Sequence, residues 1–120
     1  MQPDATGGGT IPIDRGHLQR YTLGDAGLEL EILTLFIDQA PLTYAALTSA
    51  ATAHDWSMAA HSLKGSARAV GATGVGDLAE RAEMLPFADR DARAQVLQRL
   101  ASAIDTAQHY IRGLSRSPLA

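Results

Sequence analysis

The stretch His61-Ser62-Leu63-Lys64-Gly65-Ser66-Ala67-Arg68-Ala69-Val70-Gly71-Ala72 has the apolar spacing of an amphipathic helix. If residues 54 to 72 are wound as a helix, one face is wholly apolar and consists of Trp56, Ala59, Ala60, Leu63, Ala67 and Val70. His61 falls nearly opposite that face, so we expect an exposed imidazole. The surface around it is formed by Ser57, Lys64, Gly65, Arg68 and Ala72, and His54 lies two turns earlier.

The residues beside His61 are unusual choices for a plain solvent face. Lys64 is the only lysine in the chain, and the other nine basic residues are arginines. A glycine inside a helix costs about 1 kcal/mol relative to alanine, so Gly65 suggests a place where another protein approaches closely. An isolated surface histidine, such as His17 or His109, would carry no such meaning. Here His61, Lys64 and Gly65 share one patch.

This segment resembles the signature of histidine phosphotransfer (HPt) domains. The matching positions are Ala60, His61, Leu63, Lys64, Gly65, Ser66, Ala67, Gly71 and Ala72. Asp55-Trp56 upstream and Leu78, Ala82 and Glu83 downstream also resemble the family, whereas Gly76 departs from its commoner pattern.

The resemblance implies that His61 accepts a phosphoryl group from a receiver-domain aspartate and passes it to another receiver domain. In the family the reacting atom is Nε2. Lys64 would stabilise the phosphoryl oxygens by its charge, and we expect Ser57, Met58, Gly65, Arg68 and Ala72 to form the docking surface. No cofactor is expected on this chain, because the Mg²⁺ would belong to the partner receiver domain.

Composition excludes several other classes. The net charge of −3 provides no basic footprint for nucleic acid, and the chain has no cysteine for a disulfide or a thiolate metal site. We find no acidic cluster beside His61 and no nucleotide motif, because Gly71-x-x-Gly74-x-Gly76 lacks the G-K-[ST] of a phosphate loop. We therefore expect a phosphoryl carrier that cannot phosphorylate itself from ATP. No apolar run is long enough for a membrane span, so we expect a cytoplasmic protein and a monomer.

The segments predict an all-α fold, an up-down antiparallel four-helix bundle with a short extra N-terminal helix. Expected helices cover 14–21 (capped by Asp14), 26–50 (capped by Asp25), 55–72 (capped by Asp55), 75–85 and 90–112 (capped by Asp89). Pro41 should kink the second helix or split its hydrogen bonding, Thr73-Gly74 should form a turn, and Gly113 should cap the last helix.

The expected boundaries are a flexible tail at 1–13, the HPt domain at 14–114 and a frayed C-terminus at 115–120. A chain of 120 residues that begins with Met suits a small stand-alone shuttle. Two alternatives stay open at this point. One is the phosphoacceptor domain of a chemotaxis-type histidine kinase, and the other is a helical module that binds a receiver or kinase without phosphotransfer.

Overall fold

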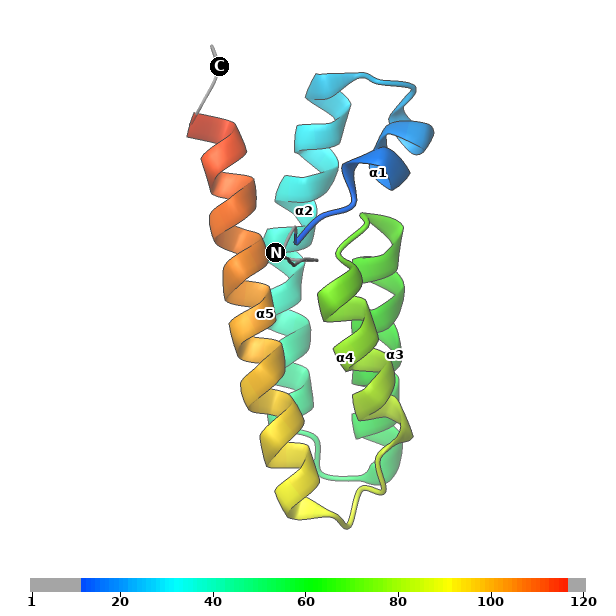
Figure 1. The fold of residues 1–120 in the computed structure, drawn as a ribbon. Helices are drawn as coiled ribbons and strands as arrows, with labels where there is room; N and C mark the ends of the chain where they lie inside the picture. Colours follow the sequence, from blue (N-terminus) through cyan, green and yellow to red (C-terminus); the bar gives the residue numbers. More distant parts are fainter. Residues whose placement is uncertain (1–11, 117–120) are drawn as a thin grey trace, which may run out of the picture.

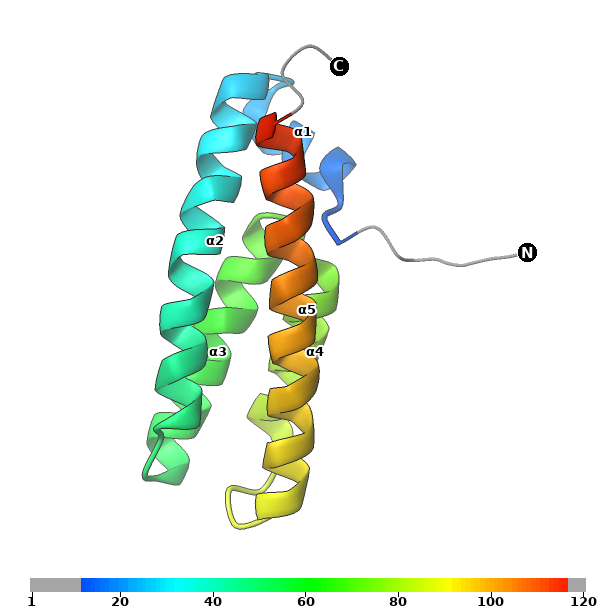
Figure 2. The same ribbon diagram turned by 90° about the vertical axis from the view of Figure 1, so that its left-hand side faces the viewer.

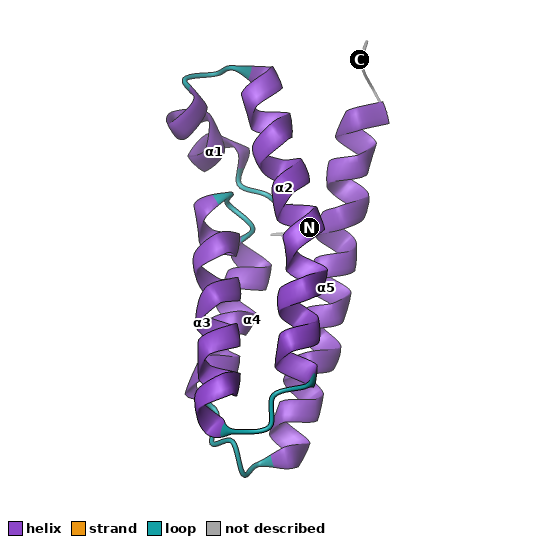
Figure 3. Ribbon diagram, turned by 180° about the vertical axis from the view of Figure 1, so that it is seen from behind, coloured by secondary structure: helices purple, strands orange, loops and turns teal. Residues whose placement is uncertain are grey.

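The computed structural model describes residues 12–116, which form five helices and no strand (Figures 1 and 3). The helices are α1 (Arg15–Thr22), α2 (Ala26–Thr48), α3 (Ala53–Ala69), α4 (Thr73–Met84) and α5 (Arg90–Arg116). Within this part of the chain, no helix combines the length and apolarity that a membrane crossing requires.

Helices α2 to α5 pack around one core. α3 lies against α4 and α2, and α5 lies against α2 and α4. Figures 1 and 2 show α2 and α5 extending beyond α3 and α4 at one end, where α1 is found. The apolar face predicted for α3 is buried, and α2 contributes Leu33, Phe36, Ala40 and Leu47 to the same core. From α5, the buried residues include Leu100, Ile104, Ala107 and Ile111. Val96 joins them, while Leu97 and Leu114 are only partly buried.

Three of the four expected N-caps are confirmed. The carboxylates of Asp14, Asp25 and Asp89 accept hydrogen bonds from backbone N–H groups three residues on, at 3.0–3.1 Å. The expected cap of α3 was wrong, because the Thr52 hydroxyl accepts from Asp55 N at 3.0 Å and the helix begins at Ala53. Asp55 lies in the first turn of the helix instead.

The turn between α3 and α4 also differs from the expectation. α3 ends at Ala69, and the chain turns at Gly71, whose φ is +82°, so that Thr73 and Gly74 already belong to α4. A Cβ at Gly71 would come within 2.7 Å of Asp14 O. The Gly71 carbonyl accepts a hydrogen bond from Asp14 N at 2.7 Å, which ties the start of α1 to this turn.

The structure also differs from the predicted boundaries at both ends of the domain. Ile13, assigned to the tail, is completely buried, whereas Tyr21, at the end of the expected first helix, is exposed. The last helix continues through Gly113 to Arg116 rather than ending at Arg112. Residues 1–11 and 117–120 of the expected tail and frayed end lie outside the described residues.

Two features join α2 to its neighbours. α2 runs unbroken through Pro41, which has no N–H to donate to Ile37 O. The side-chain amide of Gln108 on α5 donates to that carbonyl instead, at 3.3 Å.

Near the start of α2, the buried carboxylate of Glu29 pairs with Arg15 at 3.3 Å and accepts a hydrogen bond from the Thr22 hydroxyl at 3.4 Å. The sequence reading missed Glu29, because a carboxylate is rare in a core unless it is paired.

Candidate functional site

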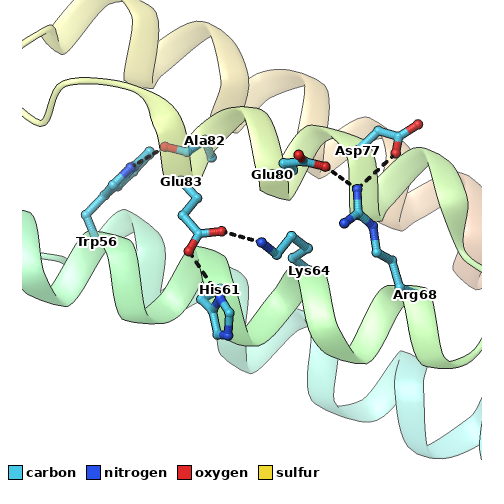
Figure 4. Close-up of polar contacts among 8 residues, drawn as sticks. All are labelled: Trp56, His61, Lys64, Arg68, Asp77, Glu80, Ala82 and Glu83. Atoms are coloured by element: carbon cyan, nitrogen blue, oxygen red, sulfur yellow. Dashed lines mark hydrogen bonds and ion pairs between the residues drawn. The ribbon is translucent and has the colours of Figure 1, made fainter.

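His61 lies on the outer face of α3, opposite the buried stripe, as the sequence predicts. Its side chain is 69% exposed. The register of α3 on α4 is held one turn earlier, where the buried Trp56 ring donates Nε1–H to Ala82 O at 2.7 Å (Figure 4). This bond places residue 83 of α4 across from His61.

Glu83 contacts both His61 and Lys64. One carboxylate oxygen lies 3.1 Å from His61 Nδ1, and the other lies 2.8 Å from Lys64 Nζ (Figure 4). His61 and Lys64 are three residues apart on α3, so they share one side of the helix and can reach the same carboxylate. The Lys64 ammonium, with a smaller contribution from His61, holds the pKa of Glu83 below its ordinary value.

The Glu83 contact determines which imidazole nitrogen carries the proton. An ionised carboxylate only accepts hydrogen bonds, so Nδ1 must donate. A neutral imidazole with its proton on Nδ1 has its lone pair on Nε2. Among the described residues, Nδ1 has a hydrogen-bond partner and Nε2 has none. In its neutral form the imidazole therefore presents an exposed nitrogen lone pair to solvent.

Arg68, one turn beyond Lys64, is also paired with α4. Its guanidinium bonds to Glu80 and lies 3.4 Å from Asp77 (Figure 4). Gly76 gives its stem room to lie across α4, since a Cβ there would be 3.0 Å from Arg68 Cγ. The two expected cations, Lys64 and Arg68, both lie near His61. Each is paired with carboxylates of α4, which the sequence of α3 alone could not predict.

The expected docking residues do not all reach the surface. Gly65 is exposed with open space around its Cβ position, Met58 and Arg68 are exposed, and Ser57 is half-buried. Ala72 was placed wrongly, because it is completely buried in the turn after α3. The Ser66 hydroxyl donates back to Leu63 O at 3.2 Å within its own helix.

A groove between α2 and α3 adjoins this surface. From α2 and the residues that follow it, the groove is lined by Leu42, Thr43, Ala46, Ser49 and Ala50, and from α3 by His54, Asp55, Met58, Ala59 and Ser62. Leu42 and Met58 are exposed apolar side chains at this groove. The sequence reading found Met58 but missed the α2 wall, because periodicity does not show which helices lie side by side.

The family model described as Hpt domain matches residues 31–110. The chain belongs to the Hpt domain family. No curated protein and no solved structure was found to match it. Hpt domains carry phosphoryl groups on histidine in two-component signalling and interact with receiver domains of response regulators and kinases, so membership agrees with the exposed imidazole of His61. The match begins inside α2, and α1 lies before it.

Proposed function

We propose that this Hpt chain is a phosphorelay shuttle in which His61 receives a phosphoryl group from one receiver aspartate and delivers it to another. The observation that carries the proposal is an exposed His61 whose Nδ1 is held by Glu83 at 3.1 Å. We further propose that α2 to α5 correspond to the up-down antiparallel bundle of the family and that α1 is the extra helix.

The proposed chemistry takes place at Nε2. Its lone pair attacks the phosphorus of the receiver's aspartyl phosphate, the P–N bond forms, and the P–O bond to the aspartate breaks with release of the carboxylate. Nδ1 keeps its proton throughout, and Glu83 stabilises the positive charge that the ring acquires. In the return step a carboxylate oxygen of the second receiver attacks phosphorus, and the neutral imidazole leaves.

Lys64 is the proposed cation for the transferred group. In the described structure it pairs with Glu83 at 2.8 Å, so its ammonium lies beside the imidazole already. An incoming phosphoryl group carries more negative charge than a carboxylate and would attract Lys64 toward its oxygens. Arg68 is a weaker candidate, because it is paired with both Glu80 and Asp77.

The proposed receiver-docking surface combines the groove between α2 and α3 with the open surface at Gly65. Leu42 and Met58 supply exposed apolar contacts, and the absence of a side chain at Gly65 allows close approach to His61. We expect the Mg²⁺ to be held by the receiver domain, and we expect this chain to act as a cytoplasmic monomer without autokinase activity.

The test is a phosphotransfer assay with a phosphorylated receiver domain and Mg²⁺. Wild-type chain should acquire an acid-labile, base-stable phosphate, and His61→Gln should acquire none while keeping its helical circular dichroism. His109→Gln is the matched control, an exposed histidine on α5 outside the groove, and it should label normally. Label that persists on His61→Gln would exclude His61 as the acceptor, and binding without any label would favour the interaction module instead.

A further inference from the structure

A small groove between α4 and α5 lies apart from the surface around His61. It has a volume of about 120 Å³ and is lined by six residues, Arg81, Leu85, Ala92, Gln95, Val96 and Arg99. We call these residues the α4–α5 groove. None of them is acidic, and none also lines the groove between α2 and α3. Pockets for small organic ligands have volumes of about 300–1,000 Å³, so the α4–α5 groove fits a single side chain and not a cofactor.

The two arginines of the α4–α5 groove have no carboxylate partner in the described part of the chain. None of the ion pairs found there includes Arg81 or Arg99. Asp77 precedes Arg81 by one turn, but it lies 3.4 Å from Arg68 on the α3 side (Figure 4). The residues three and four positions from Arg99 along α5 are all uncharged: Gln95, Val96, Ser102 and Ala103.

The charges of α4 are divided between its two sides. Its three carboxylates all pair with cations of α3: Asp77, Glu80 and Glu83. Arg81, the remaining charged residue of α4, lines the α4–α5 groove instead. A cation in the last turn of a helix is favoured by the helix dipole, which accounts for Arg81, but Arg99 lies far from both ends of α5. Local helix structure therefore gives no reason for the charge of Arg99.

The walls of the α4–α5 groove indicate which group it accepts. Val96 is 4% exposed and Leu85 is partly buried against the core, so the floor beside the arginines is apolar. Two like charges at one groove with apolar walls concentrate a positive potential there, although the net charge of the chain is −3. A guanidinium presents a fork of N–H donors that matches a carboxylate. This combination fits an apolar side chain with acidic residues beside it.

We propose that the α4–α5 groove docks an acidic segment of a partner protein, whose carboxylates meet Arg81 and Arg99 while an apolar side chain enters between them. This docking is separate from the chemistry of His61, because His61 lies on α3 and the two surfaces share no lining residue. A partner can therefore hold the chain at α4 and α5 while a receiver domain approaches α3.

The test uses the full chain and two fluorescent synthetic helical peptides with the same leucine seam. One peptide has glutamate in its flanking positions and the other has glutamine. Wild-type chain should bind the glutamate peptide about tenfold more tightly or better, with NMR shifts of the Ala92 and Gln95 amides. Arg81→Gln/Arg99→Gln should weaken binding by about tenfold or more. Ala92→Gln keeps both arginines but fills the α4–α5 groove, so it should also weaken binding.

Arg90→Gln/Arg112→Gln is the matched control, because it removes the same two charges from exposed positions of α5 outside the α4–α5 groove. It should bind the glutamate peptide as the wild type does, and circular dichroism melting shows that each variant is folded. The proposal is overturned if the two peptides bind equally, or if the control variant loses as much affinity as Arg81→Gln/Arg99→Gln.

Two further outcomes would assign the α4–α5 groove to another occupant and overturn the proposal. Inorganic phosphate that shifts the Ala92 and Gln95 amides as the glutamate peptide does would make it a site for a small anion. Self-association in sedimentation that Arg81→Gln/Arg99→Gln abolishes would make a second copy of the chain the occupant. Peptide binding requires no phosphoryl group, so a failed phosphotransfer assay leaves this result intact.

Discussion

Glu83 connects two side chains of α3, His61 and Lys64, through its two carboxylate oxygens. Its bonds to Lys64 and His61 lower its pKa below the ordinary value of 4.5. A lowered pKa in the folded state means that the ionised carboxylate contributes stability above pH 4.5. That contribution is lost as the pH falls through the lowered folded pKa.

Glu83→Gln tests this contribution with a side chain of the same shape. We expect the variant to be less stable than wild type at neutral pH, with a difference that is constant above pH 4.5 and shrinks as the pH falls further. Urea unfolding at a series of pH values measures it. A difference that does not change with pH would mean that the charge of Glu83 contributes nothing.

Two substitutions of Gly65 test receiver docking separately from the stability of the fold. Because its Cβ position is open, Gly65→Ala should raise the free energy of unfolding by up to about 1 kcal/mol through helix propensity. Gly65→Gln should fold equally well but slow phosphotransfer from a receiver, because its side chain would occupy the surface beside His61. Labelling by the small donor phosphoramidate should be unaffected. If that labelling slows as well, the defect lies at His61 and not in docking.

At the scale of the element, α2 depends on α5 for its continuity. Pro41 leaves the Ile37 carbonyl without its helical donor, and Gln108 supplies a replacement at 3.3 Å. The sequence predicted a disturbance at Pro41 correctly, yet the compensating donor lies 71 residues from Ile37 along the chain. A local disruption of one helix thus becomes a specific contact between two helices.

Gln108→Ala should cost about 1 kcal/mol, the usual net contribution of a hydrogen bond. In a Pro41→Ala background the same change should cost less, because residue 41 can then donate to Ile37 O. Urea denaturation of the four proteins forms a double-mutant cycle. An equal cost in both backgrounds would show that Gln108 acts independently of the proline.

At the scale of the whole molecule, α1 is fastened to the turn between α3 and α4. Asp14 N donates to Gly71 O at 2.7 Å, and Ile13 and Leu18 are fully buried on either side of this link. The family match starts at residue 31, so this attachment is built from residues that precede the matched region, together with Gly71.

Gly71→Ala should destabilise the protein by at least about 2 kcal/mol, because the new Cβ would meet Asp14 O and the positive φ is strained for alanine. Gly74→Ala is the matched control three residues later, where nothing lies within 4 Å of the added Cβ. Thermal unfolding compares the two. Equal melting temperatures would show that α1 adjusts without cost.

The sequence by itself determined the helices, their buried faces and the exposure of His61, because these follow from the periodicity of residues close together in the chain. Some predicted caps and ends were wrong, as Thr52, Gly71 and Gly113 show, since neighbouring residues offer similar hydrogen bonds. Only the tertiary structure decided that Glu83 meets His61 and Lys64, that α2 forms the second wall of the groove, and that Ile13 and Ala72 are buried. These contacts join residues far apart in sequence, and the packing of whole helices brings them together.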